Sequence, residues 1–110
     1  MPNLTFYISE NQSDRFKDLY DFTHNCSTLC CEILGAESQN VHIIFIDVKT
    51  GCGQPVYAEL IYRLTKWRTQ EVMDNFMREL DFAIQQASGL IARIRCFGSP
   101  APQIFARNSP

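Results

Sequence analysis

Hydrophobic residues along the chain fall into four strand-like runs and two helix-like stripes. The strand-like runs cover residues 4–8, 41–48, 56–64 and 90–97, which are rich in β-branched, aromatic and aliphatic residues. Apolar residues recur every three or four positions in the two stripes, a spacing typical of amphipathic helices. The first stripe contains Phe16, Leu19, Tyr20, Thr23, Cys26, Cys30, Ile33 and Leu34. The second contains Val72, Met73, Phe76, Leu80, Ala83, Ile84 and Ala87.

Capping residues predict where the two helices begin and end. Ser13 or Asp14 can cap the first helix, and Thr69 can cap the second. Gly35 and Gly89 follow the two stripes directly, as glycine does just past a helix end. Residues 41–48 are apolar at nearly every position rather than at alternate ones, which indicates a strand covered on both faces of a parallel or mixed sheet.

The elements therefore follow the order β-α-β twice. We interpret residues 1–110 as a single domain, with a structural pseudo-repeat over 2–48 and 56–97 and a tail over 98–110. Two architectures share this order. One is the ferredoxin-like split βαβ fold. The other is an α+β fold in which two parallel βαβ units form one four-stranded mixed sheet, with both helices on one face. Its other face stays bare and apolar, which predicts an oligomer.

Composition and charge exclude several classes of function. Apolar residues make up 45% of the chain and the net charge is -2, so no basic field attracts nucleic acid or an anionic membrane. We find no apolar run of membrane-spanning length, no secretory signal and no RNA-recognition strand motif.

Five cysteines do not suggest a disulfide framework, so we expect a cytoplasmic protein. Cys26, Cys30 and Cys31 lack the spacing of a zinc site and are expected in the core; no metal or cofactor is predicted.

The chain start carries the strongest candidate chemistry. Pro2 follows the initiator Met1 and directly precedes the first strand. Met1 is normally removed before a small residue such as proline, which would leave a secondary amine at the sheet edge. An apolar pocket and nearby cations both disfavour the protonated amine and lower its pKa. The sequence therefore predicts Pro2 as a general base for proton abstraction next to a carbonyl. A chain start without chemistry is the alternative.

Positively charged residues and histidines supply candidate substrate-binding groups. Arg68 lies between a strand end and a helix N-cap, where a guanidinium and first-turn amides favour a carboxylate. Lys66 would assist it, and His42, at a strand start, can bind substrate or deliver a proton. Arg93 and Arg95 alternate along the fourth strand and share one face. Arg95 can add positive potential for an acid, and pairing across a subunit contact is the alternative.

Four segments resemble the tautomerase superfamily, whose members begin with a catalytic proline. Residues 40–45 (NVHIIF) resemble the second strand of that family, where 4-oxalocrotonate tautomerase has an arginine in place of His42. Residues 68–71 (RTQE) are similar to its Arg-Ser-Asp-Glu helix entry. Residues 66–68 (KWR) resemble the paired-arginine segment of malonate semialdehyde decarboxylase and related dehalogenases, and residues 19–24 resemble a histidine-bearing helix of the same relatives.

The resemblance implies a homotrimer with active sites at subunit boundaries, acting on a small 2-oxo or unsaturated carboxylic acid with Pro2 as base. The sequence departs from the family at Gln12, where 4-oxalocrotonate tautomerase has a substrate-binding arginine. Asn40 falls near the position of the water-activating carboxylate of the dehalogenases, which favours proton transfer over hydration. A cofactor-independent decarboxylase or dehalogenase/hydratase, and a non-catalytic ferredoxin-like ligand-binding module, are the alternatives.

Overall fold

A computed structural model describes residues 2–108; Met1, with its predicted removal, and the last two residues of the tail lie outside the described residues. The strands are β1 (Asn3–Ser9), β2 (His42–Val48), β3 (Val56–Arg63) and β4 (Ala92–Ser99). The helices are α1 (Leu19–Leu34) and α2 (Gln70–Ser88). Three short 3₁₀ turns are η1 (Glu10–Arg15), η2 (Ser38–Asn40) and η3 (Ala101–Gln103).

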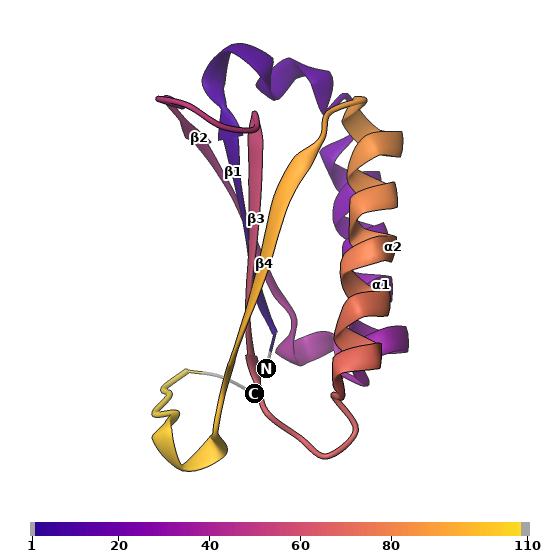
Figure 1. Cartoon of the computed structure of the whole chain (residues 1–110), viewed down its shortest axis with the longest axis vertical. Coiled ribbons are helices and arrows are strands. Elements are labelled where there is room, and N and C mark those ends of the chain that lie inside the picture. The colour runs from indigo at the N-terminus through magenta and orange to yellow at the C-terminus, as the bar shows by residue number, and fades with distance from the viewer. Residues whose placement is uncertain (1, 109–110) are drawn as a thin grey trace.

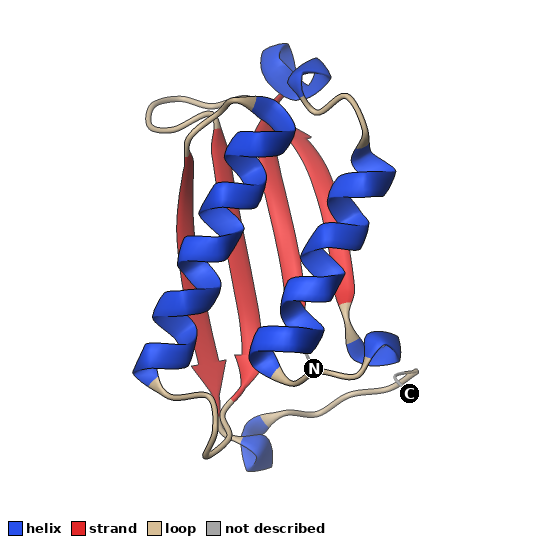
Figure 2. Ribbon diagram, turned by 90° about the vertical axis from the view of Figure 1, so that its right-hand side faces the viewer, coloured by secondary structure: helices blue, strands red, loops and turns tan. Residues whose placement is uncertain are grey.

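The strands form one mixed sheet in the order β2-β1-β3-β4. β1 is parallel to β2, β3 is parallel to β4, and the two halves meet where β1 and β3 run antiparallel. Both helices pack on the same face of the sheet (Figures 1 and 2). This is the predicted α+β arrangement of two βαβ units. The ferredoxin-like alternative is wrong, because β1 and β2 are direct neighbours instead of being split by another strand.

The core lies between the sheet and the helix layer. Alternate residues of β1 and β3 point into it, because side chains along a strand alternate between faces. Phe6 is central: its ring contacts Phe22 of α1 at 5.1 Å and Phe45 of β2 at 5.3 Å between centroids. Each such fully buried apolar side chain contributes roughly 1.5–3 kcal/mol. The largest buried apolar side chains are Leu4, Phe6, Phe22, Leu34, Leu60, Phe76, Leu80 and Ile84.

The first helix begins later than predicted. Asp18, not Ser13 or Asp14, is its N-cap, and the Asp18 carboxylate accepts a hydrogen bond from the Asp21 amide at 2.9 Å. Ser13 belongs to η1, where its hydroxyl donates to the Glu10 carbonyl. Phe16 is buried, as predicted, but reaches the core from the connection before the helix.

The predicted stripe of α1 is correct in its second half and wrong in its first turn. Leu19 and Tyr20 are 42% and 88% exposed, whereas Phe22 is 1% exposed. The buried residues Phe22, Cys26 and Cys30 repeat every four positions, as one helical face requires. Phe16 precedes the N-cap Asp18, so its position along the chain does not mark the buried face of the helix.

Signals at the other helix boundaries are confirmed. Gly35 and Gly89 close α1 and α2 in the left-handed conformation, with φ of 69° and 72°. The Thr69 hydroxyl caps α2 by accepting from the Val72 amide. β4 begins two residues later than predicted, at Ala92. None of the helices within residues 2–108 combines the length and apolarity needed to cross a membrane.

The sheet face opposite the helices, here called the outer face, carries three registered rows of side chains. From the N-terminal end of β1, these rows are His42–Asn3–Ile61–Phe97, then Ile44–Thr5–Glu59–Arg95, then Ile46–Tyr7–Tyr57–Arg93. Neither α1 nor α2 covers this face, since both lie on the other side of the sheet (Figure 1). Ile44 and Ile46 are therefore 41% and 39% exposed, and β2 is covered on one face only, contrary to the prediction.

Candidate functional site

Pro2 lies at the start of β1 with its ring in the core. The ring is fully buried and continues the inward-facing series of Leu4, Phe6 and Ile8. The Pro2 carbonyl accepts a hydrogen bond from the His42 amide at 3.0 Å, which joins the chain start to β2. The Pro2 nitrogen therefore sits where an apolar core meets the end of the sheet.

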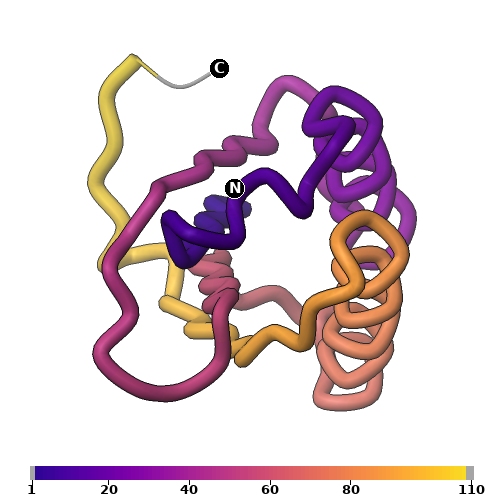
Figure 3. The backbone as a smooth tube through the Cα atoms, turned by 90° about the horizontal axis from the view of Figure 1, so that it is seen from above, coloured from indigo at the N-terminus to yellow at the C-terminus, as the bar shows by residue number. Residues whose placement is uncertain are grey.

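Arg63 is brought to the same end by strand register. Asn3 pairs with Ile61 in the antiparallel ladder, and Arg63 is the last residue of β3, two positions further towards the chain start. A cavity of about 150 Å³ lies there, between the strand ends and the C-terminal segment. It is lined by Asn3, Ile61, Tyr62, Arg63, Ser99, Ile104, Phe105 and Ala106. Figure 3 shows the C-terminal segment on the side of the sheet away from the helices.

Two buried polar oxygens lie in the loops that enter and leave the sheet at this end. Asn40 Oδ1 precedes β2, and Thr65 Oγ1 follows β3. Neither has a hydrogen-bond partner within residues 2–108. Buried polar atoms are nearly always partnered in folded proteins, so an unpaired one calls for an explanation such as an unseen donor.

Arg68 is held by the backbone of two other segments. Its Nε donates to the Leu34 carbonyl at 3.0 Å, and one terminal nitrogen donates to the Arg63 carbonyl at 2.8 Å. Burial lowers the pKa of Arg68. The guanidinium satisfies the carboxyl end of α1, where the helix dipole favours a cation. Arg68 therefore links α1 to the end of β3. Most of its guanidinium is engaged within the fold, and at most part of it can contact a ligand.

The remaining predicted site residues divide between two places. Lys66 is exposed in the β3–α2 loop at the Pro2 end, and His42 is exposed on the outer face, in the row of Asn3. Arg95 is one row further along, on the edge strand β4, and lines a different cavity. Pro2, His42, Lys66 and Arg68 thus lie at the same end of the sheet, but the Pro2 ring is in the core and His42 is on the outer face; Arg95 is further along β4.

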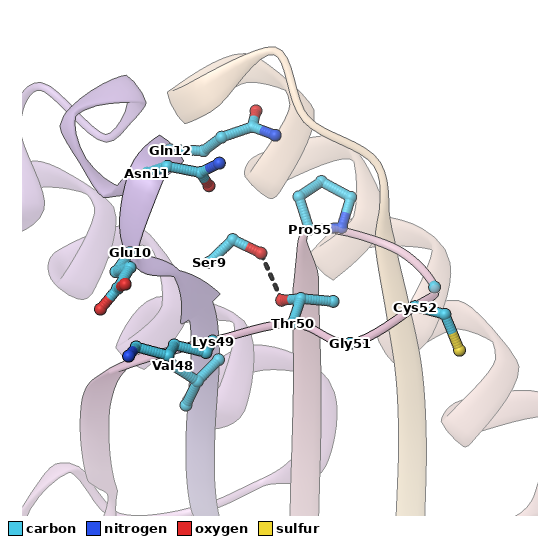
Figure 4. A pocket seen from close by; sticks show the side chains of 11 residues that line it. Ser9, Glu10, Asn11, Gln12, Val48, Lys49, Thr50, Gly51, Cys52 and Pro55 are labelled. Atoms are coloured by element: carbon cyan, nitrogen blue, oxygen red, sulfur yellow. Dashed lines mark hydrogen bonds between the residues drawn. The ribbon is translucent and has the colours of Figure 1, made fainter.

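The opposite end of the sheet has an open cavity of about 430 Å³. Figure 4 shows its side chains, among them Gln12, Ser9 and Lys49; the Ser9 and Thr50 hydroxyls are hydrogen-bonded to each other. Gln12 is the position where the family resemblance predicts an arginine. Within one chain, Gln12 and Pro2 are therefore at opposite ends of β1.

Cysteines and acidic residues form no evident metal site. Within residues 2–108, no group of three or more potential ligands gathers closely enough to hold a metal ion. Cys26 and Cys30 are buried in the core, as predicted. His24 is exposed on α1. The site residue that sequence reasoning did not select is Arg63, and its only signal is strand register.

Comparison with known proteins identifies the fold. No family model matches the sequence, and no curated protein is detectably related to it. Solved structures do match. A member of the cis-3-chloroacrylic acid dehalogenase family, N1, aligns with a TM-score of 0.78 and 13% identity over 98% of this chain and 83% of its own. A symmetric trimer of fused 4-OT aligns with a TM-score of 0.76 and 13% identity over 97% and 95% of the two chains.

Malonate semialdehyde decarboxylase is a third similar structure, with a TM-score of 0.67 and 15% identity over 96% of this chain and 91% of its own. These proteins belong to the tautomerase superfamily, and the chain has the fold of that superfamily. The resemblance predicted from the sequence is thereby confirmed at the level of fold.

Proposed function

We propose that the chain is a keto–enol tautomerase or isomerase acting on a small 2-oxo or unsaturated carboxylic acid. Pro2, freed by removal of Met1, is its general base. The observation that carries this proposal is the buried Pro2 ring at the chain start, at the same end of the sheet as a cavity lined by Arg63. Burial and a neighbouring cation both disfavour the protonated amine, so the pKa of the Pro2 amine falls towards neutrality. A base of that strength is suited to proton abstraction.

The surrounding residues take distinct roles in this proposal. Arg63 binds the substrate carboxylate, because it lines the cavity and its guanidinium can form two parallel hydrogen bonds. Lys66 adds positive charge and His42 delivers a proton, both from exposed positions at this end of the sheet. Arg68 holds the end of β3, which carries Arg63. The buried oxygens of Asn40 and Thr65 accept hydrogen bonds from the freed amine or from the substrate. Cationic groups directed at the developing enolate supply the rest of the catalysis.

Proton transfer fits this site better than addition of water. None of the described residues lining the cavity is a carboxylate. Asn40 has an amide, which cannot deprotonate water as a carboxylate does. Decarboxylation or dehalogenation, the chemistry named for two of the similar structures, is therefore the second reaction class.

We also propose that the chain assembles into a homotrimer through its outer face. Exposed apolar side chains occupy that face on three strands: Ile44, Ile46, Ile61 and Phe97. Contiguous exposed apolar surface of this kind marks an interface. The fused 4-OT structures are trimers. All five cysteines are free, which suits the reducing cytoplasm.

The test compares wild-type protein with Pro2→Ala and Pro55→Ala. Pro55 is the matched control, because it precedes β3 as Pro2 precedes β1 and lies at the other end of the sheet. An enolised 2-oxo acid is mixed with each protein, and ketonisation is followed by ultraviolet absorbance. We expect Pro2→Ala to lose about 10²–10⁴-fold in rate, the usual contribution of a general base, and Pro55→Ala to keep the wild-type rate.

Mass spectrometry of the intact protein accompanies the assay and establishes that Met1 is absent. A variant with one uncleaved residue before Pro2 should be as inactive as Pro2→Ala, because an amide nitrogen is not basic. Equal rates for wild type, Pro2→Ala and the extended variant would refute the proposed role of Pro2.

A further inference from the structure

Two arginines of β4 line a cavity on the outer face that the proposed reaction does not use. This cavity has a volume of about 430 Å³ and lies beneath the loop between β2 and β3. Its polar lining includes Thr50, Gln54, Tyr7, Tyr57, Arg93 and Arg95. A volume of that size accommodates a small molecule.

Strand register determines how these side chains are arranged. Tyr7, Tyr57 and Arg93 are consecutive members of one row, and Arg95 lies in the next row. The Tyr7 and Tyr57 rings stack at 5.7 Å between centroids with 19° between their planes. Arg93 and Arg95 are two residues apart on one strand, so their Cα atoms are about 7 Å apart and both side chains leave the same face. The cavity thus has an aromatic wall and a pair of cations.

Charge on this part of the outer face is unbalanced. Glu59 is the only carboxylate in the three rows, and it accepts a hydrogen bond from the Tyr57 hydroxyl at 2.9 Å. The Arg95 guanidinium lies 5.3 Å from the centroid of the Phe97 ring, which positions the cation without neutralising it. Two guanidiniums therefore face one carboxylate, in a chain whose net charge is -2.

We propose that this cavity binds a small oxyanion, a carboxylate or a phosphate group, between Arg93 and Arg95. Guanidinium groups bind both kinds of anion through paired hydrogen bonds. The stacked Tyr7 and Tyr57 rings form the wall against which the body of the ligand packs. Tyr7 is five residues from Pro2, roughly 16 Å along the strand. Within one chain the cavity is therefore separate from Pro2, and in the proposed trimer it faces a neighbouring subunit, because it shares its rows with Ile44 and Ile46.

The experiment titrates the intact ¹⁵N-labelled protein, in the assembly it forms in solution, at constant ionic strength. Inorganic phosphate and succinate are the two anionic probes, and succinamide is the neutral control. We expect saturable shifts of amide signals near Tyr57 and Arg93 with at least one anion and none with succinamide. Tighter binding of phosphate identifies a phosphate ligand, and tighter binding of succinate identifies a carboxylate. Absence of saturation with both anions would overturn the proposal.

Variants test whether the two arginines are responsible. The double variant Arg93→Ala/Arg95→Ala should weaken binding at least tenfold, whereas Arg78→Ala, on the helix layer, should bind as wild type does. The double variant Arg93→Lys/Arg95→Lys keeps the charge and the fold but loses the guanidinium fork, so it should bind with intermediate affinity. Unchanged affinity in both double variants would overturn the proposal.

Pro2→Ala separates this site from the proposed reaction. We expect it to bind the anion as tightly as wild type does, because Pro2 does not line this cavity. Loss of anion binding in Pro2→Ala would place the anion at the chain start and overturn the second site. A catalytically inactive wild type that still binds the anion would refute the tautomerase proposal alone.

Discussion

Arg63 and Arg68 carry the same charge but differ in what their guanidiniums contact. Arg68 donates to the carbonyls of Leu34 and Arg63, and it is partly buried. Arg63 is exposed and lines the cavity next to Pro2. A hydrogen bond from a charged donor to a partly buried carbonyl stabilises the fold, whereas an exposed arginine remains available to a ligand. We therefore expect Arg68 to stabilise the fold and Arg63 to bind a ligand.

Substitution of each arginine should affect a different measurement. We expect Arg68→Ala to lower the free energy of unfolding by about 1–3 kcal/mol, because it leaves two carbonyls without their charged donor. Arg63→Ala should change that free energy by less than about 0.5 kcal/mol and should raise KM for the acid substrate. Urea denaturation and steady-state kinetics measure the two effects. A large loss of stability in Arg63→Ala with unchanged KM would contradict the assignment.

The five cysteine thiols should differ widely in reactivity. Burial raises the pKa of Cys30 to about 12 and that of Cys96 to about 11, and burial also raises the pKa of Cys26. At pH 8 these thiols are protonated, and the thiolate is the reactive form. Cys52 is exposed in the loop between β2 and β3.

Iodoacetamide at pH 8 should therefore modify Cys52 first, and it should leave Cys26 and Cys30 unmodified until the chain is unfolded in urea. Peptide mass spectrometry identifies the alkylated positions. In Cys52→Ser, the fast phase of alkylation should disappear. Rapid labelling of Cys26 in the folded wild type would show that the core between α1 and the sheet opens readily.

At the scale of single elements, the start of α1 gives the sharpest test. Asp18 caps the helix through the Asp21 amide, whereas Asp14 lies in η1 and caps no helix. Replacing a capping aspartate by alanine costs about 0.5–2 kcal/mol. Asp18→Ala should therefore lower the free energy of unfolding by that amount, and Asp14→Ala should have little effect. Thermal denaturation followed by circular dichroism measures both. Equal losses of stability in the two variants would instead support the helix start at Ser13 or Asp14 that the sequence predicts.

Local signals explain which elements were predictable. Gly35, Thr69 and Gly89 act within one helical turn of their own position, so their roles follow from residue type and spacing. The first turn of α1 was mispredicted, because Phe16 is buried like a helical residue but precedes the cap. Its burial depends on contact with Phe22, at 5.2 Å between ring centroids, which spacing along the chain does not specify.

The candidate site was predictable only in part for the same reason. Pro2 is recognisable from its place after Met1, whereas the burial of its ring in the core is seen only in the structure. The importance of Arg63 depends on the register between β1 and β3, and the contacts of Arg68 join segments that are distant in sequence. Such long-range pairings become visible only once the strands are aligned.

At the scale of the whole molecule, the two sides of the sheet differ in what covers them. Both helices cover one side, whereas exposed apolar residues stay on the other, including Ile44, Ile61 and Phe97. Burying these side chains removes apolar surface from water, at roughly 25 cal/mol per Å². The outer face is thus the surface through which an oligomer gains most, while the helix layer offers fewer exposed apolar groups.

For the proposed homotrimer, light scattering coupled to size exclusion should give about three times the chain mass of 12.7 kDa. Ile44→Asp should shift the protein towards the monomer, because a carboxylate in an apolar interface must be desolvated without a partner. Phe82→Asp is the matched control, since Phe82 is exposed on α2 at the opposite surface. It should leave the mass unchanged. If Phe82→Asp dissociates the protein and Ile44→Asp does not, the helix layer is the interface and the outer face is free.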